Sequence, residues 1–302
     1  MTDHLHSHFH RVRNVIRTHA RRKDPTNTTR IRRAFEQEIN RRFSQLKKLI
    51  RQSLVEADAL ALKANEVPAL GKRAFEFRRS GDKVQDFMDW LKRVEDDTIF
   101  SIIPGTPNRA AKDSAWANTY LKSAYQQGLQ QSASHMRAGG IRVSREWAES
   151  AFFRPIHADR LGLVYTRTFT DLVGVTDVMD VAIARILAQG LGEGRNPVDM
   201  ARDIVDKVDG IGRARARTIA RTEVISAHAE ASLNAYTEAG LSGVRVRAEW
   251  STAGDDRVCD ECADMEGKEF DIEDAHGMIP LHPNCRCAFI PVVGDPEGKE
   301  LR

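Results

Sequence analysis

The sequence predicts a mainly α-helical protein, with an elongated helical body followed by a small β-rich C-terminal module. Over most of the first 240 residues, apolar side chains recur at steps of three and four, which is typical of helices that bury one face. From Val244 to Trp250 the period changes to two, the spacing of a half-buried strand. All four cysteines follow, between residues 259 and 287, so the module also differs from the body in composition.

The longest predicted helix occupies residues 28–63, a stretch without proline or glycine. Its apolar residues form a single stripe: Ile31, Phe35, Ile39, Phe43, Leu46, Ile50 and Leu54. Such a stripe must be buried, either against another helix of the same chain or against a second subunit. An oligomer formed through residues 31–54 is therefore one of two expectations.

Further helices are predicted by the same spacing and by their end signals. The expected segments are 84–94, 109–137 ending near Gly139 and Gly140, 176–189 stopped by Gly190 and Gly192, a helix opened by Asn196 and Pro197, and 213–239 closed by Gly240. Besides the strand at 244–250, short strands are expected at 269–272 and 287–292.

The charge of the chain is uneven. Residues 1–52 hold 14 basic and 4 acidic residues, whereas the remainder holds 32 basic and 39 acidic residues. An N-terminal arm rich in His and Arg (residues 1–27) can therefore neutralise phosphates or meet an acidic protein surface, although solvated arms of this kind are common. The candidate phosphate-binding residues in the arm are Arg11, Arg13, Arg17, Arg21, Arg22 and Lys23.

Membrane insertion and secretion are not expected. No stretch approaches the 18 apolar residues of a spanning helix, and the polar N-terminus lacks the apolar core of a signal peptide. The default compartment is thus the cytoplasm, where thiols stay reduced and disulfides are rare.

The cysteines form a pattern suited to zinc. Cys259 and Cys262 are separated by two residues, and Cys285 and Cys287 by one residue, with His282 shortly before them. Thiolates and imidazole are the preferred ligands of tetrahedral Zn²⁺, and four protein ligands make a site structural because none is left for a catalytic water. Five candidates compete for four places; we favour the four cysteines, with His282 either replacing one of the last pair or lying in the second shell.

A second motif is glycine-rich. Residues 209–219 resemble a helix-hairpin-helix motif, in which a Gly-x-Gly turn offers backbone N–H groups to a DNA phosphate. Gly210 and Gly212 would form the turn, and Arg213 and Arg215 would add charge. The alternative is a tight turn between two helices with exposed arginines, because one Gly-x-Gly pattern is weak evidence.

The order of the motifs resembles a known family. A helix carrying Arg221-Thr222-Glu223 precedes the strand, the Asp255–Cys259 turn, Cys262, Gly267 and finally the His282–Cys287 segment. This arrangement is similar to the Mu F-like head morphogenesis proteins of tailed bacteriophages. The likeness covers roughly residues 150–293 and is specific in the last 75 or so of them.

The resemblance implies a minor head protein that associates with the portal and assists head assembly and DNA packaging or delivery. It implies residence in the virion, after assembly in the host cytoplasm, with portal and other head proteins as partners and double-stranded DNA as a further candidate. The expected organisation is the arm (1–27), a helical region (28–140), the Mu F-like domain (141–293) with its zinc module at about 244–293, and a tail (294–302).

Two other classes of function fit parts of the sequence. The first is a separate DNA-binding protein that uses the Gly-x-Gly segment and the arm, whose affinity for duplex DNA would fall steeply with salt. The second is a metal-dependent nuclease, which needs His or carboxylate ligands around an open metal. Only Asp274 and His276 are spare candidates near the cysteines, so we expect no enzymatic activity.

Overall fold

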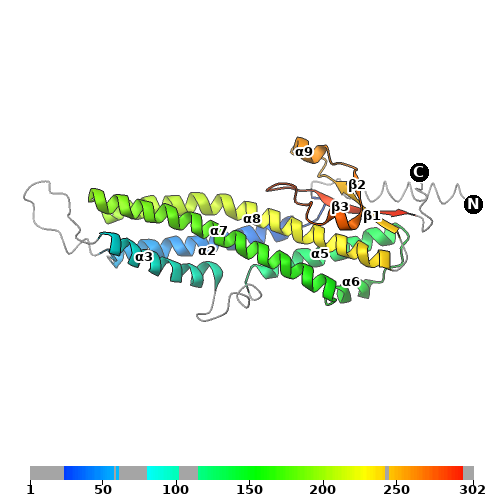
Figure 1. The fold of residues 1–302 in the computed structure, drawn as a ribbon, viewed down its shortest axis with the longest axis horizontal. Coiled ribbons are helices and arrows are strands. Elements are labelled where there is room, and N and C mark those ends of the chain that lie inside the picture. The colour runs from blue at the N-terminus through cyan, green and yellow to red at the C-terminus, as the bar shows by residue number, and fades with distance from the viewer. Residues whose placement is uncertain (1–23, 58, 61–79, 102–114, 242–244, 295–302) are drawn as a thin grey trace, which may run out of the picture. The chain divides into compact units, whose positions relative to one another are not determined.

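The computed structural model describes residues 24–57, 59–60, 80–101, 115–241 and 245–294 (Figure 1). The first described helices are α2 (Thr29–Arg51), which continues into the π-helical turn η1 (Gln52–Glu56), and α3 (Ser80–Glu95), which continues into η3 (Asp96–Phe100). They are followed by α5 (Asn118–Ala138), α6 (Arg145–Ala151), α7 (Pro155–Glu193) and α8 (Pro197–Leu241).

The C-terminal module contains a three-stranded antiparallel sheet of order β2-β1-β3 (Figure 1). Its elements are β1 (Arg245–Ser251), α9 (Asp260–Ala263), β2 (Glu269–Phe270), α10 (Ile272–Ala275) and β3 (Ala288–Gly294). Val246, Ala248 and Trp250 are buried as predicted. Glu249, which the alternation placed on the exposed face, is buried as well. Trp250 packs edge-on against Phe289, and both side chains belong to a core that also contains Tyr125 of α5 and Tyr236 of α8.

The chain divides into two compact units. One unit comprises Met1–Phe35, Ala117–Thr168 and Thr218–Arg302, and the other comprises Glu36–Trp116 and Phe169–Arg217. The first unit contains α5, α6, the C-terminal part of α8 and the sheet. Its helices approach closely at Gly128 of α5, where a Cβ would lie 2.6 Å from the carbonyl oxygen of His228. Only glycine fits this contact without a backbone shift.

The predicted stripe on residues 31–54 is buried within the chain. Phe35, Ile39, Phe43, Leu46, Ile50 and Leu54 are each at most 3% exposed. The first of the two expectations, burial inside the same chain, is therefore correct. The second was wrong, because no apolar stripe remains on these residues to form an oligomer.

The starts of α7 and α8 compare differently with the prediction. Helix α7 begins at Pro155 and not at Thr176, so it includes Gly162 and Gly174 in its interior. Helix α8 begins at Pro197 as predicted, with the Asn196 side chain accepting a hydrogen bond from the Val198 N–H.

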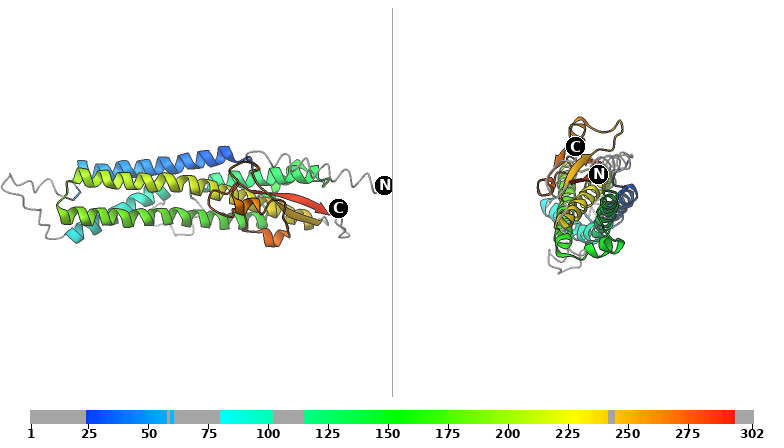
Figure 2. Two further views of the ribbon diagram at one scale, coloured as in Figure 1. Left: turned by 90° about the horizontal axis from the view of Figure 1, so that it is seen from above. Right: turned by 90° about the vertical axis from the view of Figure 1, so that its right-hand side faces the viewer.

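The predicted turn at Gly210 and Gly212 was wrong, because α8 runs through both residues without interruption (Figure 2). Gly212 instead allows close packing: a Cβ there would lie 3.2 Å from the Phe43 ring. Tertiary contact thus offsets the roughly 1 kcal/mol that a glycine costs in a helix interior.

Some expectations fall outside the described residues. These include the arm residues Arg11, Arg13, Arg17, Arg21, Arg22 and Lys23, together with most of the 294–302 tail. Within the described part of the chain, no helix is long and apolar enough to cross a membrane.

In the second unit, the buried carboxyl group of Glu95 on α3 faces the partly exposed carboxyl group of Asp180 on α7. Glu95 is fully buried, and its pKa is raised to about 8 by desolvation and by the negative charge of Asp180. Lys92 opposes this shift from 3.7 Å, whereas Asp96 adds to it. Asp177 also faces the lysine, at 3.6 Å. The pair therefore holds a proton that the unfolded chain would release above the ordinary pKa of 4.5.

This shift predicts that the folded state is less stable at alkaline pH. Because the folded pKa of Glu95 lies above its unfolded value, the free energy of unfolding should fall as pH rises from about 4.5 to about 8. Replacing Glu95 by Gln should flatten this dependence and stabilise the protein by on the order of 2 kcal/mol at pH 8.5. Urea unfolding at pH 5 and 8.5 measures both effects.

The exposed neighbour Asp97 offers a matched control, because Asp97→Asn removes a carboxylate without changing the Glu95–Asp180 pair. An unfolding free energy of Glu95→Gln that shows the same pH slope as the parent would contradict the assignment.

Candidate metal centre

The first two cysteines lie at the start of α9. Cys259 caps this helix with extended backbone, and its Sγ accepts a hydrogen bond from the Cys262 N–H at 3.4 Å. One short helical turn therefore aims both sulfurs to the same side, as the two-residue spacing predicted. Cys259 is exposed, whereas Cys262 is buried.

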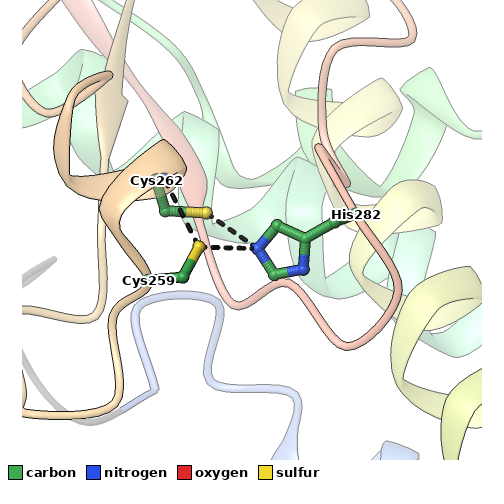
Figure 3. Close-up of side chains that lie close together, drawn as sticks. All are labelled: Cys259, Cys262 and His282. Atoms are coloured by element: carbon green, nitrogen blue, oxygen red, sulfur yellow. Dashed lines mark hydrogen bonds between the residues drawn. The ribbon is translucent and has the colours of Figure 1, made fainter.

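His282 completes a group of three (Figure 3). Its Nε2 lies 3.1 Å from the Sγ atoms of both Cys259 and Cys262. Its Nδ1 lies 2.9 Å from the carbonyl oxygen of Pro283, which can only accept a hydrogen bond, so Nδ1 carries the proton. The unprotonated Nε2 is then the nitrogen that faces the sulfurs, the tautomer that a metal-binding histidine requires.

Cys262 also belongs to a second group of three, with Cys285 and Cys287. The potential ligand atoms within each group lie within 4.8 Å of one another. The Sγ atoms of Cys262 and Cys285 are 3.9 Å apart. Two thiolates on one tetrahedral Zn²⁺, with Zn–S bonds of about 2.3 Å, would be separated by about 3.8 Å. All four thiols are free, and the residues present fit a metal ion of this kind.

The four sulfurs differ in acidity. Burial, and then the Cys285 sulfur, raise the pKa of Cys262 to about 12. The hydrogen bond from the Cys287 thiol lowers the pKa of Cys285 to about 5 and raises that of Cys287. The hydrogen bond from the Cys262 N–H lowers the pKa of Cys259. The cluster resists full ionisation by itself because neighbouring thiolates repel, and a bound cation relieves that repulsion.

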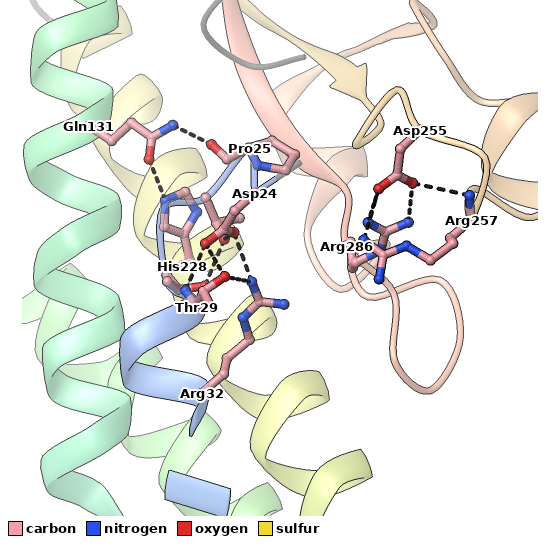
Figure 4. Close-up of polar contacts among 11 residues, drawn as sticks. Asp24, Pro25, Thr29, Arg32, Gln131, His228, Asp255, Arg257 and Arg286 are labelled. Carbon is pink, nitrogen blue, oxygen red and sulfur yellow. Dashed lines mark hydrogen bonds and ion pairs between the residues drawn. The ribbon is translucent and has the colours of Figure 1, made fainter. Parts of the chain in front are cut away.

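An ion pair joins the two segments that carry the cysteines (Figure 4). Asp255, four residues before Cys259, accepts hydrogen bonds from two nitrogens of Arg286 at 2.7 and 2.5 Å. Arg257 also contacts this carboxylate, and these contacts hold the pKa of Asp255 well below its usual range. The ion pair is bidentate, and two parallel hydrogen bonds fix the relative orientation of Asp255 and Arg286. It therefore sets the spacing between the two cysteine segments.

The Arg-Thr-Glu signature connects α8 to its neighbours. The hydroxyl of Thr222 accepts a hydrogen bond from the Asn284 N–H at 3.2 Å, which docks the His282–Cys287 segment on α8. Glu223 is buried and accepts from Arg167 at 2.9 Å and from the Thr168 hydroxyl at 3.1 Å, which ties α8 to α7. Two of the three signature residues thus hold the frame around the cysteines.

Sequence reasoning missed Glu230, two helical turns after Glu223. Its buried carboxylate accepts hydrogen bonds from His276 Nδ1 at 2.7 Å and from the Gly277 N–H at 2.9 Å. No local pattern signals this contact, because 46 residues separate Glu230 from His276. Neither His276 nor Asp274 joins a group able to hold a metal among the described residues.

The glycine-rich segment offers no backbone N–H groups to a phosphate. Gly210 and Gly212 are helix-interior residues, so their N–H groups lie within the hydrogen-bonded helix. Arg213 forms an ion pair with Asp209 at 2.8 Å, and Arg215 is exposed. The structural basis for a helix-hairpin-helix site is therefore missing from this helix.

These features define a class of protein: a helical chain that ends in a small β module built around a candidate structural metal site. Sequence comparison gives the family. Residues 182–290 match the family described as Phage Mu protein F like protein. The match confirms the resemblance over these residues, which are similar to the Phage Mu protein F-like family. No curated protein and no solved structure matches the chain.

Proposed function

We propose that the protein is a minor head protein of a tailed phage, which docks on the portal and assists head assembly and DNA packaging or delivery. The observation that carries this proposal is the Mu F-like match over residues 182–290, which spans the Arg-Thr-Glu helix and the cysteine module. The contact of Thr222 supports it, because this hydroxyl docks the His282–Cys287 segment of that module on α8. Glu223 ties the same helix to α7. The virion is the location that this role requires.

The proposed role is structural and not enzymatic. A candidate centre with four protein ligands leaves no position for a catalytic water. His276, the residue considered for a nuclease, is held by Glu230. A separate DNA-binding function is not favoured, since the predicted Gly-x-Gly turn is absent from α8.

We further infer that Cys259, Cys262, His282 and Cys285 hold one structural Zn²⁺. The contacts of His282 Nε2 with two sulfurs and the 3.9 Å spacing of Cys262 and Cys285 support this set. Cys287 then donates its thiol hydrogen to the Cys285 sulfur as an outer partner. The four-cysteine set favoured from the sequence remains the alternative.

The domain organisation is also a proposal. A zinc module at about 244–293, within a Mu F-like domain at 141–293, agrees with the position of β1, β2 and β3 around the cysteines. The arm, the helical region 28–140 and the tail complete this division.

The function is tested in phage particles. A phage whose gene for this protein carries a nonsense codon should form few infectious particles, and complementation by the full chain should restore them. Mass spectrometry of purified wild-type virions should detect the protein in low copy number together with the portal. Normal particle yield without the protein, or its absence from virions, would contradict the role.

A further inference from the structure

An unusual face lies along residues 153–167, at the start of α7. Phe153 is 81% exposed and Leu163 is 63% exposed, and Ile156 is also exposed. Within α7, Ile156, Arg160, Leu163 and Arg167 follow one another at steps of three and four residues, so these four side chains share one side of the helix. Phe153 lies in the turn just before the helix. Clustered exposed apolar side chains, unlike scattered ones, mark interaction surfaces.

A pocket of about 240 Å³ adjoins this face within the same unit. Arg160, Leu163 and Arg167 line it from α7, Glu230 from α8, and His276 from the segment after α10. The pocket gives the face a concave edge into which a side chain of a partner can insert, as anchor residues of protein interfaces do.

Buried carboxylates orient the two arginines. Arg160 Nε lies 3.4 Å from Glu230, and Arg167 NH2 lies 2.9 Å from Glu223. Both carboxylates are nearly inaccessible, whereas the arginine side chains are 33% and 45% exposed. An approaching partner therefore meets the guanidinium N–H groups first, and of the two carboxylates only Glu230 also lines the pocket. Asp159 is exposed on the opposite edge of the apolar stripe, away from the pocket.

We propose that this face, residues 153–167 with the adjoining pocket, binds an acidic amphipathic segment of a partner head protein. Carboxylates of the partner would pair with Arg160 and Arg167, and its apolar side chains would cover Leu163, Ile156 and Phe153. A nucleic acid suits the face less well, because a phosphate backbone cannot cover three exposed apolar side chains. The inference rests on the proposed function, which requires docking on other head proteins.

The test uses the full chain and the purified portal protein of the same phage as the probe. Leu163→Asp should weaken portal binding by at least about 30-fold, because it places a charge at the apolar centre of the face. Arg160→Glu should weaken it by about tenfold and reduce its salt dependence. Val198→Asp is the matched control, since Val198 is also an exposed apolar residue near a helix start, and its affinity should stay within about twofold of the parent.

The outcomes separate the two proposals. Parent protein that does not bind the portal overturns the proposed function and this inference with it. Parent protein that binds, while Leu163→Asp and Arg160→Glu bind equally well, overturns the docking face alone. A parallel titration with duplex DNA tests the other class of partner. If Arg160→Glu loses affinity for DNA but binds the portal as the parent does, the inference is also overturned. Circular dichroism checks that each variant is folded.

Discussion

Replacing Cys262 by Ser is expected to release the metal and unfold the module that contains β1, β2 and β3. Cys262 is the sulfur shared by both ligand groups, and it is buried between them. A segment of about 50 residues has too small a core to fold by itself. Zinc binding supplies on the order of 10 kcal/mol to such modules, and a serine hydroxyl does not replace a thiolate ligand.

Two measurements on the full chain check this expectation under reducing conditions. Elemental analysis should find about one zinc per parent chain and almost none in Cys262→Ser. Hydrogen exchange should lose its protection in β1 and β3, while protection is retained in the second unit, in α3 and in residues 36–51 of α2. Cys287→Ser is the matched control, since we place Cys287 outside the four ligands; it should keep its zinc.

The result also decides between the two ligand sets. Loss of zinc in Cys287→Ser, with retention in His282→Ala, would show that four cysteines hold the ion and that His282 lies in the second shell. Parent protein purified without any zinc would refute the metal site altogether, and the module would then owe its fold to the core that Trp250 shares with α5 and α8.

The sequence predicted correctly those elements that are determined by residues close to them along the chain. The alternation from Val244 to Trp250 gave β1 to within one residue of its observed bounds. Asn196 and Pro197 fixed the start of α8, since a cap and a proline act within one helical turn. The cysteine spacing predicted that Cys259 and Cys262 would share one side of a turn, and they do.

Errors arose where a distant contact decides the conformation. The sequence around Gly210 and Gly212 predicts a break, yet helix α8 continues because Gly212 packs on Phe43, more than 160 residues away in sequence. For the same reason, the sequence did not predict which residues the Arg-Thr-Glu signature contacts. Glu223 meets Arg167 across 56 residues, and no periodicity reveals which cation a buried carboxylate will find.

The Glu223–Arg167 pair leads to the second large expected effect. Arg167→Ala should lower the free energy of unfolding by about 2–3 kcal/mol, because it removes a guanidinium from a carboxylate that is 1% exposed. The figure lies at the lower end for a buried pair, since Arg167 itself is partly exposed and the Thr168 hydroxyl still donates to Glu223. Urea unfolding of the full chain at neutral pH measures the change.

Glu223→Gln should lower the free energy of unfolding clearly less than Arg167→Ala does. It leaves a neutral amide in place of the buried charge, and the exposed guanidinium of Arg167 remains hydrated. The double variant is the decisive comparison: if the charge pair is responsible, Arg167→Ala should cost much less in the Glu223→Gln background than in the parent. Equal costs in both backgrounds would mean that Arg167 stabilises the helix pair by packing of its aliphatic chain. In that case the glutamate of the signature would have a role other than tying α8 to α7.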